Sequence, residues 1–482
     1  MFIYKRFKPQ HFLEFLNQGL FDDEINEVIK FFPLYEPKLQ FELVHYLRKN
    51  PSLSVSLTTF SKALNISQKD AKVILTAPAK TSKIVLTSEE NEGKVIKALV
   101  IPGTSKVITN NEHIKKDLSL IKRFIKKGFA VFFEETFSGK SFMLPIAVSL
   151  YINNLPSDLV FTGRLNSKGE IFDVEHIEEK FRVAKKENLR LVTPSQVKNI
   201  KVIKAFLDRD RWNIPFYVTS ESLEEMKHFL EFFPEKFVER EFELFKGLEL
   251  FYDLTKEKFC LVTGQLKDKK DWETACNEFY TRIQLVKNKL PGSKVFHFGI
   301  RGPASLAFAF GTLWGAQDQF IVYHYQTGKY HPISVEDPKH LKEKLKNIED
   351  LDWIFEKKGD DLVIILKLSH HELLADVKSY VKSYLKTPSF LFIEHRKSGN
   401  LLIEDFKKVV QEIASLIQDI RRNHSFKSFH FFFSCPVAIA FMLGVTFGHY
   451  VSGYIYNYQQ NEQTYSPVIN FSTLKNLRER AF

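Results

Sequence analysis

Cysteine is scarce in this sequence, and the few cysteines form no motif. Cys260, Cys276 and Cys435 are the only ones among 482 residues, and none stands in a CxxC or CxxH pattern. A disulfide framework is therefore not expected, and so few thiols favour a reducing compartment, the cytoplasm. The HExxH pattern of many zinc enzymes is also missing, so we expect no metal and no other cofactor. Residues 1–12 lack the apolar run of a secretory signal.

Long hydrophobic runs are nearly absent as well. Residues 429–458 are the exception, since they are almost uncharged and rich in Phe, Val, Ile and Tyr, as a membrane span would be. The same stretch is one copy of a repeat that follows a strand–helix–strand pattern. We therefore expect its apolar character to come from burial in a sheet and not from a membrane.

What is present fits a globular protein of more than one domain. Hydrophobic residues make up 44% of the sequence and charged residues 26%. A chain of 482 residues is too long for one core, so two or three domains are expected. The 69 Lys and Arg exceed the 58 Asp and Glu, which gives a net charge of +11. This surplus favours anionic partners without choosing among them, and a Lys-rich solvated surface explains it equally well.

An internal repeat occupies the C-terminal half. Residues 296–326 align without gaps with residues 429–459, at a constant offset of 133 positions. Many of the matched residues are aromatic, Gly or Pro, which chance does not readily produce, so we predict a duplication. The matched pairs include Phe296/Phe429, His297/His430, Phe298/Phe431, Pro303/Pro436, Phe308/Phe441, Gly311/Gly444, Gly315/Gly448 and Tyr323/Tyr456.

Each copy reads as one structural unit. A short apolar strand (296–300 or 429–433) is followed by a turn with a Pro and by a helix of small and apolar residues (304–314 or 437–447). Gly315 or Gly448 ends the helix, and a second strand follows. Upstream strands are expected at 259–266 and 362–372, each followed by a helical stretch, at 272–287 and 373–384.

The loops of the first copy suggest a binding site. In open α/β sheets, ligands bind at the carboxyl ends of parallel strands, where the loops after 266 and 300 would meet. The helix after Pro303 presents N–H groups that suit a phosphate, and Arg301 offers a forked donor. A surface arginine and turn-forming glycines explain the same residues, and the sequence alone leaves both interpretations open.

Residues 295–315 and 320–333 resemble the SAVED sensor domain, a fusion of two CARF-like halves found in bacterial antiviral systems. The resemblance covers roughly residues 254–482 and implies a cyclic oligonucleotide ligand. In the second copy, Ser434, Cys435 and Pro436 replace Arg301, Gly302 and Pro303, so an asymmetric site is expected. The ligand-binding candidates are Thr263, Gly264, Gln265, Arg301, Gly302, Pro303, Ala304, Ser305, Lys367, Ser369, His370, Arg396 and Ser434.

The N-terminal half begins with helices and continues with strands. Residues 1–75 show apolar positions at helical spacing, and residues 57–72 fit a small helix–turn–helix, which makes DNA binding an alternative. Strands are expected at 82–87, 94–102 and 106–109. A basic helix at 113–128 would end at Gly128, and an apolar helix would begin near Ser141.

Residues 162–196 resemble the proteolytic domain of Lon-family proteases. In that family a Thr-Gly pair opens a hairpin, and the catalytic lysine stands 18 positions after the threonine; here these are Thr162 and Lys180. The nucleophilic serine follows a Gly-x pair, which fits Ser141 after Gly139 and Lys140. The resemblance therefore implies a Ser–Lys dyad, with Thr162 in support.

The chemistry suits these residues. A serine hydroxyl needs a base, and a lysine serves as that base only when burial lowers its pKa enough to make it neutral. We expect Phe142, Phe172, Ile177 and Phe181 to supply that burial. The sequence departs from the family where Glu175 and His176 replace two glycines, so a Lon-like fold without catalysis stays an alternative.

The sequence thus predicts a multidomain α/β protein. Its expected parts are a helical N-terminal region (1–75), a Lon-like α+β protease domain (76–221), a helical connector (222–253) and a sensor domain (254–482). The sensor would consist of two CARF-like, Rossmann-type α/β halves at about 254–350 and 351–482.

The chain as a whole resembles the CRISPR-associated Lon–SAVED proteases of type III antiviral systems. That resemblance implies cyclic oligoadenylate, specifically cyclic tetra-adenylate, as activator, a protein substrate encoded nearby, and head-to-tail oligomers formed on activation. No stable binding of DNA or RNA and no membrane association are expected. Two other functions stay open, a catalytically inactive scaffold controlled by a cyclic nucleotide and a transcription regulator that uses the N-terminal helices.

Overall fold

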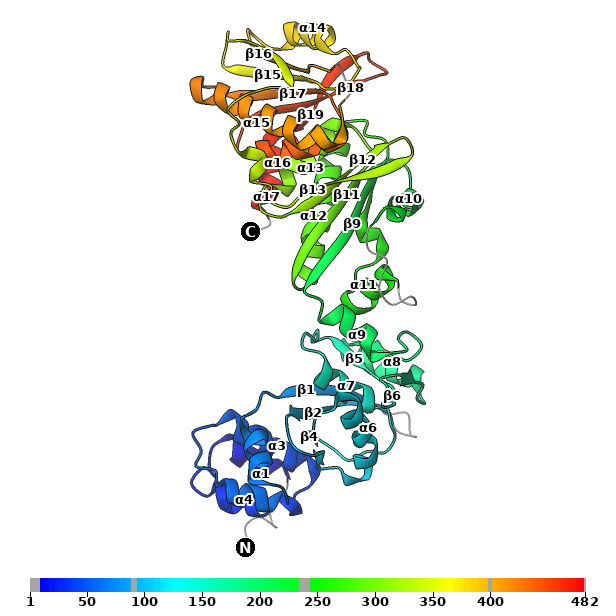
Figure 1. Ribbon diagram of the computed structural model, residues 1–482. Helices are drawn as coiled ribbons and strands as arrows, with labels where there is room; N and C mark the ends of the chain where they lie inside the picture. The colour runs from blue at the N-terminus through cyan, green and yellow to red at the C-terminus, as the bar shows by residue number, and fades with distance from the viewer. Residues whose placement is uncertain (1–8, 88–92, 234–242, 398–400, 481–482) are drawn as a thin grey trace. The chain divides into compact units, whose positions relative to one another are not determined.

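The computed structural model describes residues 9–87, 93–233, 243–397 and 401–480. The chain divides into two compact units, Met1–Arg209 and Asp210–Phe482, which are considered separately below (Figure 1).

The first unit opens with helices that pack on a sheet. These are α1 (Pro9–Asn17), α2 (Ile25–Lys30), α3 (Pro37–Lys49), α4 (Leu57–Ala63) and α5 (Gln68–Thr76). Their apolar faces share one buried cluster with Leu99, Ile101, Ala130 and Phe132 of the sheet. The helical region predicted at 1–75, of which residues 1–8 lie outside the described residues, is therefore a layer of the first unit, because its apolar stripes pack on one another and on the sheet.

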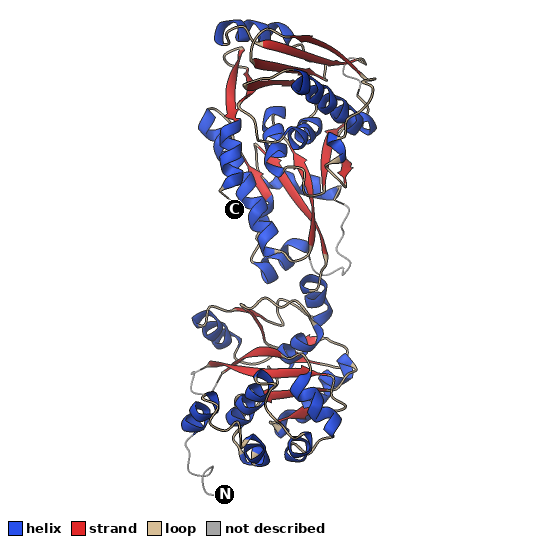
Figure 2. Ribbon diagram, turned by 90° about the vertical axis from the view of Figure 1, so that its left-hand side faces the viewer, coloured by secondary structure: helices blue, strands red, loops and turns tan. Residues whose placement is uncertain are grey.

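The sheet of the first unit is mixed and has the order β3-β4-β2-β1-β5-β8. Its strands are β1 (Lys80–Leu86), β2 (Lys94–Pro102), β3 (Ile108–Thr109), β4 (Phe129–Phe133), β5 (Leu159–Phe161) and β8 (Arg190–Val192). The helices between them are α6 (Lys115–Ile125), α7 (Met143–Tyr151) and α8 (Ile177–Lys186), and α9 (Ile200–Leu207) follows the last strand. Figure 2 shows helices on both faces of this sheet.

Two local features of the first unit can be compared with the sequence. The hairpin of β6 (Arg164–Leu165) and β7 (Ile171–Phe172) turns at Asn166–Gly169 as predicted, with Gly169 at a φ of 87°. The basic helix does not end at Gly128 as expected. It ends at Ile125, and the C-cap residue Lys126 adopts a left-handed backbone with a φ of 60°. Gly128 is required for another reason, since a Cβ there would lie 2.1 Å from the Thr104 carbonyl oxygen.

The second unit contains two sheets. The first has the order β10-β9-β11-β12-β13, with strands β9 (Arg211–Thr219), β10 (Cys260–Val262), β11 (Ser293–Ile300), β12 (Phe320–Gln326) and β13 (Lys329–Val335). Its helices are α10 (Met226–Glu231), α11 (Leu244–Tyr252), α12 (Lys269–Lys289) and α13 (Ala304–Trp314). Strands β10, β9, β11 and β12 are parallel, and β13 is antiparallel to β12.

The second sheet repeats this arrangement. Its order is β14-β16-β15-β17-β18-β19, with β14 (Leu351–Glu356), β15 (Asp361–Lys367), β16 (Ser389–His395), β17 (Ser428–Ser434), β18 (Gly453–Gln459) and β19 (Thr464–Asn470). The helices are α14 (Leu374–Tyr384), α15 (Phe406–Asn423), α16 (Val437–Phe447) and α17 (Phe471–Glu479). Both helices and all four strands predicted for the repeat are present, so residues 429–458 form a strand, a helix and a strand.

The order of the strands changes one predicted equivalence. β11 lies between β9 and β12, and its repeat β17 lies between β15 and β18. Since β12 and β18 are the second strands of the repeat, β9 is the counterpart of β15. This corrects two predictions from the sequence: the pairing of residues 259–266 with 362–372, and the assignment of residues 211–219 to a protease domain that runs to 221. The structure puts β9 in the second unit because it bonds to β11 along its whole length.

The predicted connector at 222–253 also belongs to the second unit where it is described. Helices α10 and α11 lie there, between β9 and β10, in the place that α14 takes between β15 and β16. Residues 234–242 of the connector lie outside the described residues.

The two halves of the second unit meet through α13 and α16 (Figure 1). The helices cross so closely that a Cβ on Gly311 would lie 1.9 Å from the Phe441 carbonyl oxygen, and one on Gly444 would lie 2.0 Å from that of Phe308. Aromatic rings also pack across the two halves: the ring centroids of Phe298 and Phe441 are 4.9 Å apart, and those of Phe308 and Phe431 are 4.7 Å apart. Since each contact recurs with the halves exchanged, the duplication behaves like a fused symmetric dimer.

A buried histidine is repeated in both halves. His297 on β11 contacts the Tyr323 hydroxyl at 3.0 Å and the Asn213 side-chain oxygen at 3.3 Å, which ties β12 and β9 to β11. Its counterpart His430 contacts the Tyr456 hydroxyl at 2.9 Å. Burial lowers the pKa of His297 to about 4, so this ring is neutral at physiological pH.

The glycine at the helix crossing gives a first prediction. Gly311→Ala should lower the free energy of unfolding by roughly 3 kcal/mol, because the new methyl group has no room and the helices must separate. Gly302→Ala is the matched control, since its Cβ would be 3.9 Å from the nearest atom. Thermal and urea unfolding of the two variants measure the difference. Equal stability would show that the crossing is looser than described.

The buried histidine gives a second prediction. The folded protein holds His297 neutral down to a pKa of about 4, whereas the unfolded chain protonates it near 6.5. Stability is therefore lost as the pH falls from 6.5 to 4, by about 3 kcal/mol for this residue. Urea unfolding at several pH values should show a smaller acid loss for His297→Gln than for wild type. His340→Gln, at an exposed ring, should leave the loss unchanged.

Candidate functional site

Lys180 is buried on the inner face of α8 although its side chain is charged. Lys180 and Ala184, one turn apart, are the buried residues of this helix, and Lys180 is 4% exposed. Its Nζ donates a hydrogen bond to the Glu175 carbonyl oxygen at 2.5 Å. Burial lowers the pKa of Lys180 from its usual 10.5, although the charges of Glu175 and Glu179 oppose the shift. A lysine with a lowered pKa becomes neutral more readily and can then accept a proton.

Thr162 faces the same layer between the sheet and α8. Val160 of β5 packs against Ala184, and side chains two residues apart on a strand share a face, so Thr162 points to the same side. Its N–H still bonds to the Val192 oxygen of β8, at 3.0 Å. Because α8 connects the parallel strands β5 and β8, it runs opposite to them, and Lys180 lies beyond Ala184 in the direction of Thr162. The Thr162 hydroxyl is buried and has no hydrogen-bond partner among the described residues.

Ser141 lies at the end of the same strand. Its carbonyl oxygen accepts a hydrogen bond from the N–H of Gly163 at 3.2 Å, and the Gly163 oxygen accepts one from Leu144 at 3.1 Å. The Ser141 hydroxyl is partly exposed and forms no hydrogen bond within the described part of the chain. The three predicted catalytic residues are thus gathered around the carboxyl end of β5.

An open cavity of about 450 Å³ lies between residues 113–117 and the loop 136–140, which leads to Ser141. The residues just before the serine, Ser138, Gly139 and Lys140, form one wall, and Ile114 and Asp117 line the opposite one. Lys140 forms an ion pair with Asp117 at 3.6 Å. The cavity ends at Lys140, the residue before Ser141, and neither Ser141, Thr162 nor Lys180 lines it.

The surroundings of Lys180 differ from the prediction. Phe172 and Phe181 do not cover it, since they are 38% and 41% exposed. Phe142 is buried among Phe133 and Phe137 instead. His176, where the resembled family has glycine, keeps a left-handed backbone with a φ of 58°. The backbone that glycine favours is therefore retained although the residue has changed.

In the second unit, the predicted ligand residues of the first half meet at one edge of the sheet. The N–H of Arg301 bonds to the Val218 oxygen at 2.8 Å, and the N–H of Thr263 bonds to the Thr219 oxygen at 2.8 Å, so both loops flank the end of β9. Gly264 has a φ of 63°, and Gln265 is exposed beside it. This is the carboxyl edge, where α/β sheets bind ligands.

The start of α13 joins this edge to the second half. Gly302 and Pro303 precede the helix, Pro303 is its N-cap residue, and Ala304 is its first residue. The buried Ser305 hydroxyl donates to the Asn457 side-chain oxygen of β18 at 2.8 Å. The helix N-terminus therefore reaches the carboxyl end of the other sheet, a contact with Asn457 that the sequence did not predict.

The second half keeps its cation on a different strand. Lys367 ends β15 and lies opposite Ser434 of β17, whose counterpart by the repeat is Arg301. In the first half, Thr219 lies next to Arg301 in the same way. In the first half the hydroxyl of Thr219 is on β9 and the cation Arg301 follows β11. In the second half the cation Lys367 is on β15 and the hydroxyl of Ser434 is on β17, so the two groups have exchanged strands. An asymmetric ligand site therefore stays a prediction, and the sheet edge of the second half carries a positive charge from Lys367.

Three other predicted residues have distinct places. The Ser369 and Ser434 hydroxyls are 2.6 Å apart, and Ser434 also donates to the His371 carbonyl oxygen, at 2.9 Å. His370 is exposed beside Ser369. Arg396 turns to the outer strand β14, where its Nε lies 3.0 Å from an Asp352 oxygen, so the structure does not bring it to the other ligand candidates.

Both cations of this edge are bound by glutamates that the sequence analysis did not single out. Arg301 forms ion pairs with Glu225 and, at 3.5 Å, with Glu221. Lys367 pairs with Glu372 and, at 2.8 Å, with Glu394. In the sequence these acidic residues read as ordinary solvated positions. One feature of the sequence could have pointed to them: Glu221 and Glu225 follow β9, and Glu372 follows β15. The place of β9 in its sheet was not predicted, so this feature could not be used.

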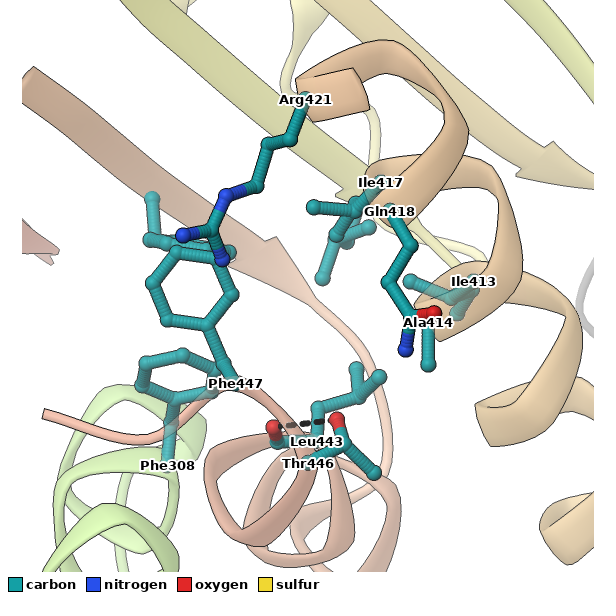
Figure 3. Close-up of a pocket in the computed structure, with 11 residues that line it drawn as sticks. Phe308, Ile413, Ala414, Ile417, Gln418, Arg421, Leu443, Thr446 and Phe447 are labelled. Atoms are coloured by element: carbon teal, nitrogen blue, oxygen red, sulfur yellow. Dashed lines mark hydrogen bonds between the residues drawn. The ribbon is translucent and has the colours of Figure 1, made fainter. Parts of the chain in front are cut away.

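A smaller cavity of about 30 Å³ lies inside the second half, between α15 and α16 (Figure 3). Apolar side chains such as Ile413, Ile417 and Leu443 line it, and Arg421 covers one side. Its volume admits a water molecule but no nucleotide. The sheet edge therefore stays the better candidate for ligand binding.

Comparison with known families identifies the second unit. Residues 257–335 and 337–471 match the model of SAVED, the SMODS-associated and fused to various effectors sensor domain. The chain carries a SAVED domain. This confirms the resemblance stated from the sequence, and it places Arg301, Lys367 and Ser434 inside the matched region. The SAVED match begins after β9, although the structure includes β9 in the first SAVED sheet.

Solved structures with some similarity are Cap4 SAVED/CARF-domain containing receptors. One, from Acinetobacter baumannii with the cyclic trinucleotide 2'3'3'-cAAA, is 16% identical over 42% of this chain and 44% of that chain, with a TM-score of 0.35. The receptor with 3'3'3'-cAAA aligns over 96% of this chain and 86% of its own, at 11% identity and a TM-score of 0.37. Cap4 of Moraxella osloensis is 14% identical over 42% and 43%, with a TM-score of 0.30.

The first of these alignments spans less than half of the Cap4 chain, and the family match alone identifies the SAVED domain. None of the curated proteins matches this chain. Within the described residues, no helix combines the length and the apolar character needed to cross a membrane. In the same part of the chain, no three His, Cys, Asp or Glu side chains gather where they could hold a metal ion.

The buried lysine gives a third prediction. Since folding lowers the pKa of Lys180, its charge destabilises the folded state fully below the folded pKa, and this effect disappears as the pH rises toward 10.5. Lys180→Met should therefore raise the free energy of unfolding at pH 7 by roughly 1 kcal/mol. Urea unfolding should show the gain shrinking at alkaline pH. Lys185→Met, at an exposed position of α8, should change little; an equal gain there would refute the burial argument.

Proposed function

We propose that this chain is a Ser–Lys protease controlled by a cyclic oligonucleotide that binds its SAVED domain. The observation that carries the protease part is the placement of Lys180, buried with a lowered pKa, on the side of α8 that faces Thr162. A buried amine without a carboxylate hydrogen bond costs stability, and such costs are typical of functional sites. The match of residues 257–335 and 337–471 to SAVED supports the sensor part.

The proposed reaction is peptide hydrolysis through an acyl-enzyme. Neutral Lys180 takes the proton from the Ser141 hydroxyl, and the Ser141 oxygen attacks the substrate carbonyl carbon. The protonated lysine then gives the proton to the leaving amine, and water releases the acyl group by the same route in reverse. Thr162 orients the Lys180 amine through its unpaired hydroxyl.

Backbone donors for the developing oxyanion lie in the turn before α7. The N–H groups of Met143 and Leu144 are already bonded, to Lys140 and Gly163. The N–H groups of Ser141 and Phe142 donate to no acceptor among the described residues. We assign these two to the oxyanion, since donors that are fixed and unpaired before the reaction stabilise the transition state most. The cavity beside Gly139 would receive the substrate chain.

The finer assignment follows the resemblance of the whole chain. The proposed activator is a cyclic oligoadenylate, cyclic tetra-adenylate in particular, and the proposed setting is a type III CRISPR antiviral system. The substrate would be a specific protein encoded nearby, cut after the ligand drives head-to-tail oligomerisation. Arg301 and Lys367 at the carboxyl edges of the two sheets, with the N-terminus of α13 between them, suit a ring of phosphates.

The serine gives a fourth prediction. Purified protein mixed with cyclic tetra-adenylate and the proteins encoded beside it should cleave one of them, whereas Ser141→Ala should lower the rate by at least about 1,000-fold because the nucleophile is lost. Ser138→Ala, in the same loop, should retain most activity. Thermal unfolding with the ligand should show the same shift for wild type and Ser141→Ala, which reports binding independently of catalysis.

The same assay separates the protease from a regulator. If Ser141→Ala cleaves as fast as wild type, the dyad is wrong. If neither protein cleaves any neighbour while both bind the ligand, the first unit is a docking scaffold. No thermal shift with any cyclic oligoadenylate would remove the sensor assignment.

A further inference from the structure

Arg301 and Lys367, the cations at the carboxyl edges of the two SAVED sheets, are both paired with carboxylates. The Arg301 guanidinium holds Glu225 through one terminal nitrogen and Glu221, at 3.5 Å, through the other. Arg301 itself is 57% exposed, whereas the Glu225 side chain is only 16% exposed. The pair thus faces solvent on the arginine side alone, where a ligand would arrive.

Glu225 is fixed in this position by a second bond. Its other carboxylate oxygen accepts a hydrogen bond from the hydroxyl of Thr219, which is completely buried at the end of β9. The same Thr219 hydroxyl accepts a bond from the Glu221 N–H at 3.1 Å. The carboxylate is therefore built into the strand end and does not result from chance contact of two surface side chains.

The second half contains the same arrangement with different residues. Lys367, only 15% exposed, is bound by Glu372, which stands in the loop between β15 and α14. Glu225 stands in the equivalent loop, between β9 and α10. Each half therefore places a glutamate from the loop after its central strand on the cation of its own edge. The two cations lie on different strands, yet each is paired with a glutamate from the equivalent loop. This recurrence indicates that both halves need the contact between glutamate and cation.

We propose that Glu225 and Glu372 are placeholders that occupy the ligand cations and must be displaced by phosphate groups. This inference rests on the proposed cyclic oligonucleotide function and extends it to ligand selection. A guanidinium hydrogen that is donated to a carboxylate is not available to a phosphate, and the negative charge of the carboxylate repels a phosphate beside it, so the glutamate and the phosphate compete for the cation. A ligand with one phosphate group forms one new ion pair, with Arg301 or Lys367, and replaces the glutamate of that cation. A cyclic oligonucleotide that spans both halves replaces Glu225 and Glu372 together. Once one phosphate is bound, the second replacement takes place within the complex and is therefore favoured.

The placeholders therefore select against small phosphates. Inorganic phosphate and AMP each form one ion pair at the expense of an existing one, so their net free energy of binding is small. A cyclic oligonucleotide adds base contacts and several phosphates to the same exchange. Glu225 and Glu372 would thus set the threshold of the sensor without touching the ligand.

The fifth prediction tests this with binding to the full-length chain. Glu225→Gln should bind cyclic tetra-adenylate about two- to fivefold more tightly than wild type, because removing a partly exposed ion pair releases that much competition. Glu224→Gln is the matched control: it removes the same charge one residue away, where the carboxylate pairs with Lys227. Titration calorimetry should give the control the affinity of wild type.

Two further arms address selection and the second half. AMP and inorganic phosphate should bind Glu225→Gln more tightly than they bind wild type or Glu224→Gln. Glu372→Gln should gain less than Glu225→Gln, because Glu394 still holds Lys367 at 2.8 Å. Glu356→Gln, where the exposed carboxylate pairs with Lys358, is its control. If Glu225→Gln unfolds, the exposed Glu221→Gln replaces it and should show a smaller gain in the same direction.

The outcomes separate this inference from the proposed function. If wild type binds the ring and Glu225→Gln binds it equally or more weakly, the placeholder is wrong while the sensor assignment stands. If Arg301→Gln retains wild-type affinity, Arg301 does not contact the ligand, and the inference fails in the same way. If wild type binds no cyclic oligoadenylate, both fail together.

Discussion

The SAVED domain depends on the close crossing of α13 and α16. Gly311 and Gly444 allow each helix to touch the backbone of the other, at distances that leave no room for a side chain. This contact brings Phe308 and Phe441 onto the strands of the opposite half and carries the helix N-termini to the sheet edges. The position of Ser305 against Asn457 follows from it. Any ligand site shared by the two halves therefore rests on two residues that have no side chain.

Charge is treated differently at the two candidate sites. Arg301 and Lys367 face carboxylates, which keep them ionised and ready to exchange one anion for another. Within the described ranges, the only acceptor of the Lys180 amine is a carbonyl oxygen; since the amine also lies in a buried layer, folding favours its neutral form. An anion sensor needs a permanent positive charge, whereas a general base must be able to lose its proton. The environments match the roles proposed for these residues.

Much of the SAVED domain could be predicted, and particular residues show where prediction stopped. The repeat of 296–326 and 429–459 gave the strands, helices and closing glycines, since Gly315 and Gly448 both have φ near 78°. It did not reveal that β9 is the counterpart of β15, because residues 211–219 and 361–367 share no visible pattern. Glu221 and Glu225, which precede α10, lie outside the repeated segments, so their place beside Arg301 was not visible either.

The sequence by itself determined the local elements and the candidate residues. Periodicity, turn residues and the repeat act over short distances along the chain, so Ser141, Thr162, Lys180 and Arg301 could be placed on their loops and helices. Only the tertiary structure decided which groups meet. It covered Lys180 while leaving Phe172 and Phe181 exposed, and it set Glu225 on Arg301. Such contacts join residues far apart in sequence, and their free energy depends on burial and distance, which no local pattern contains.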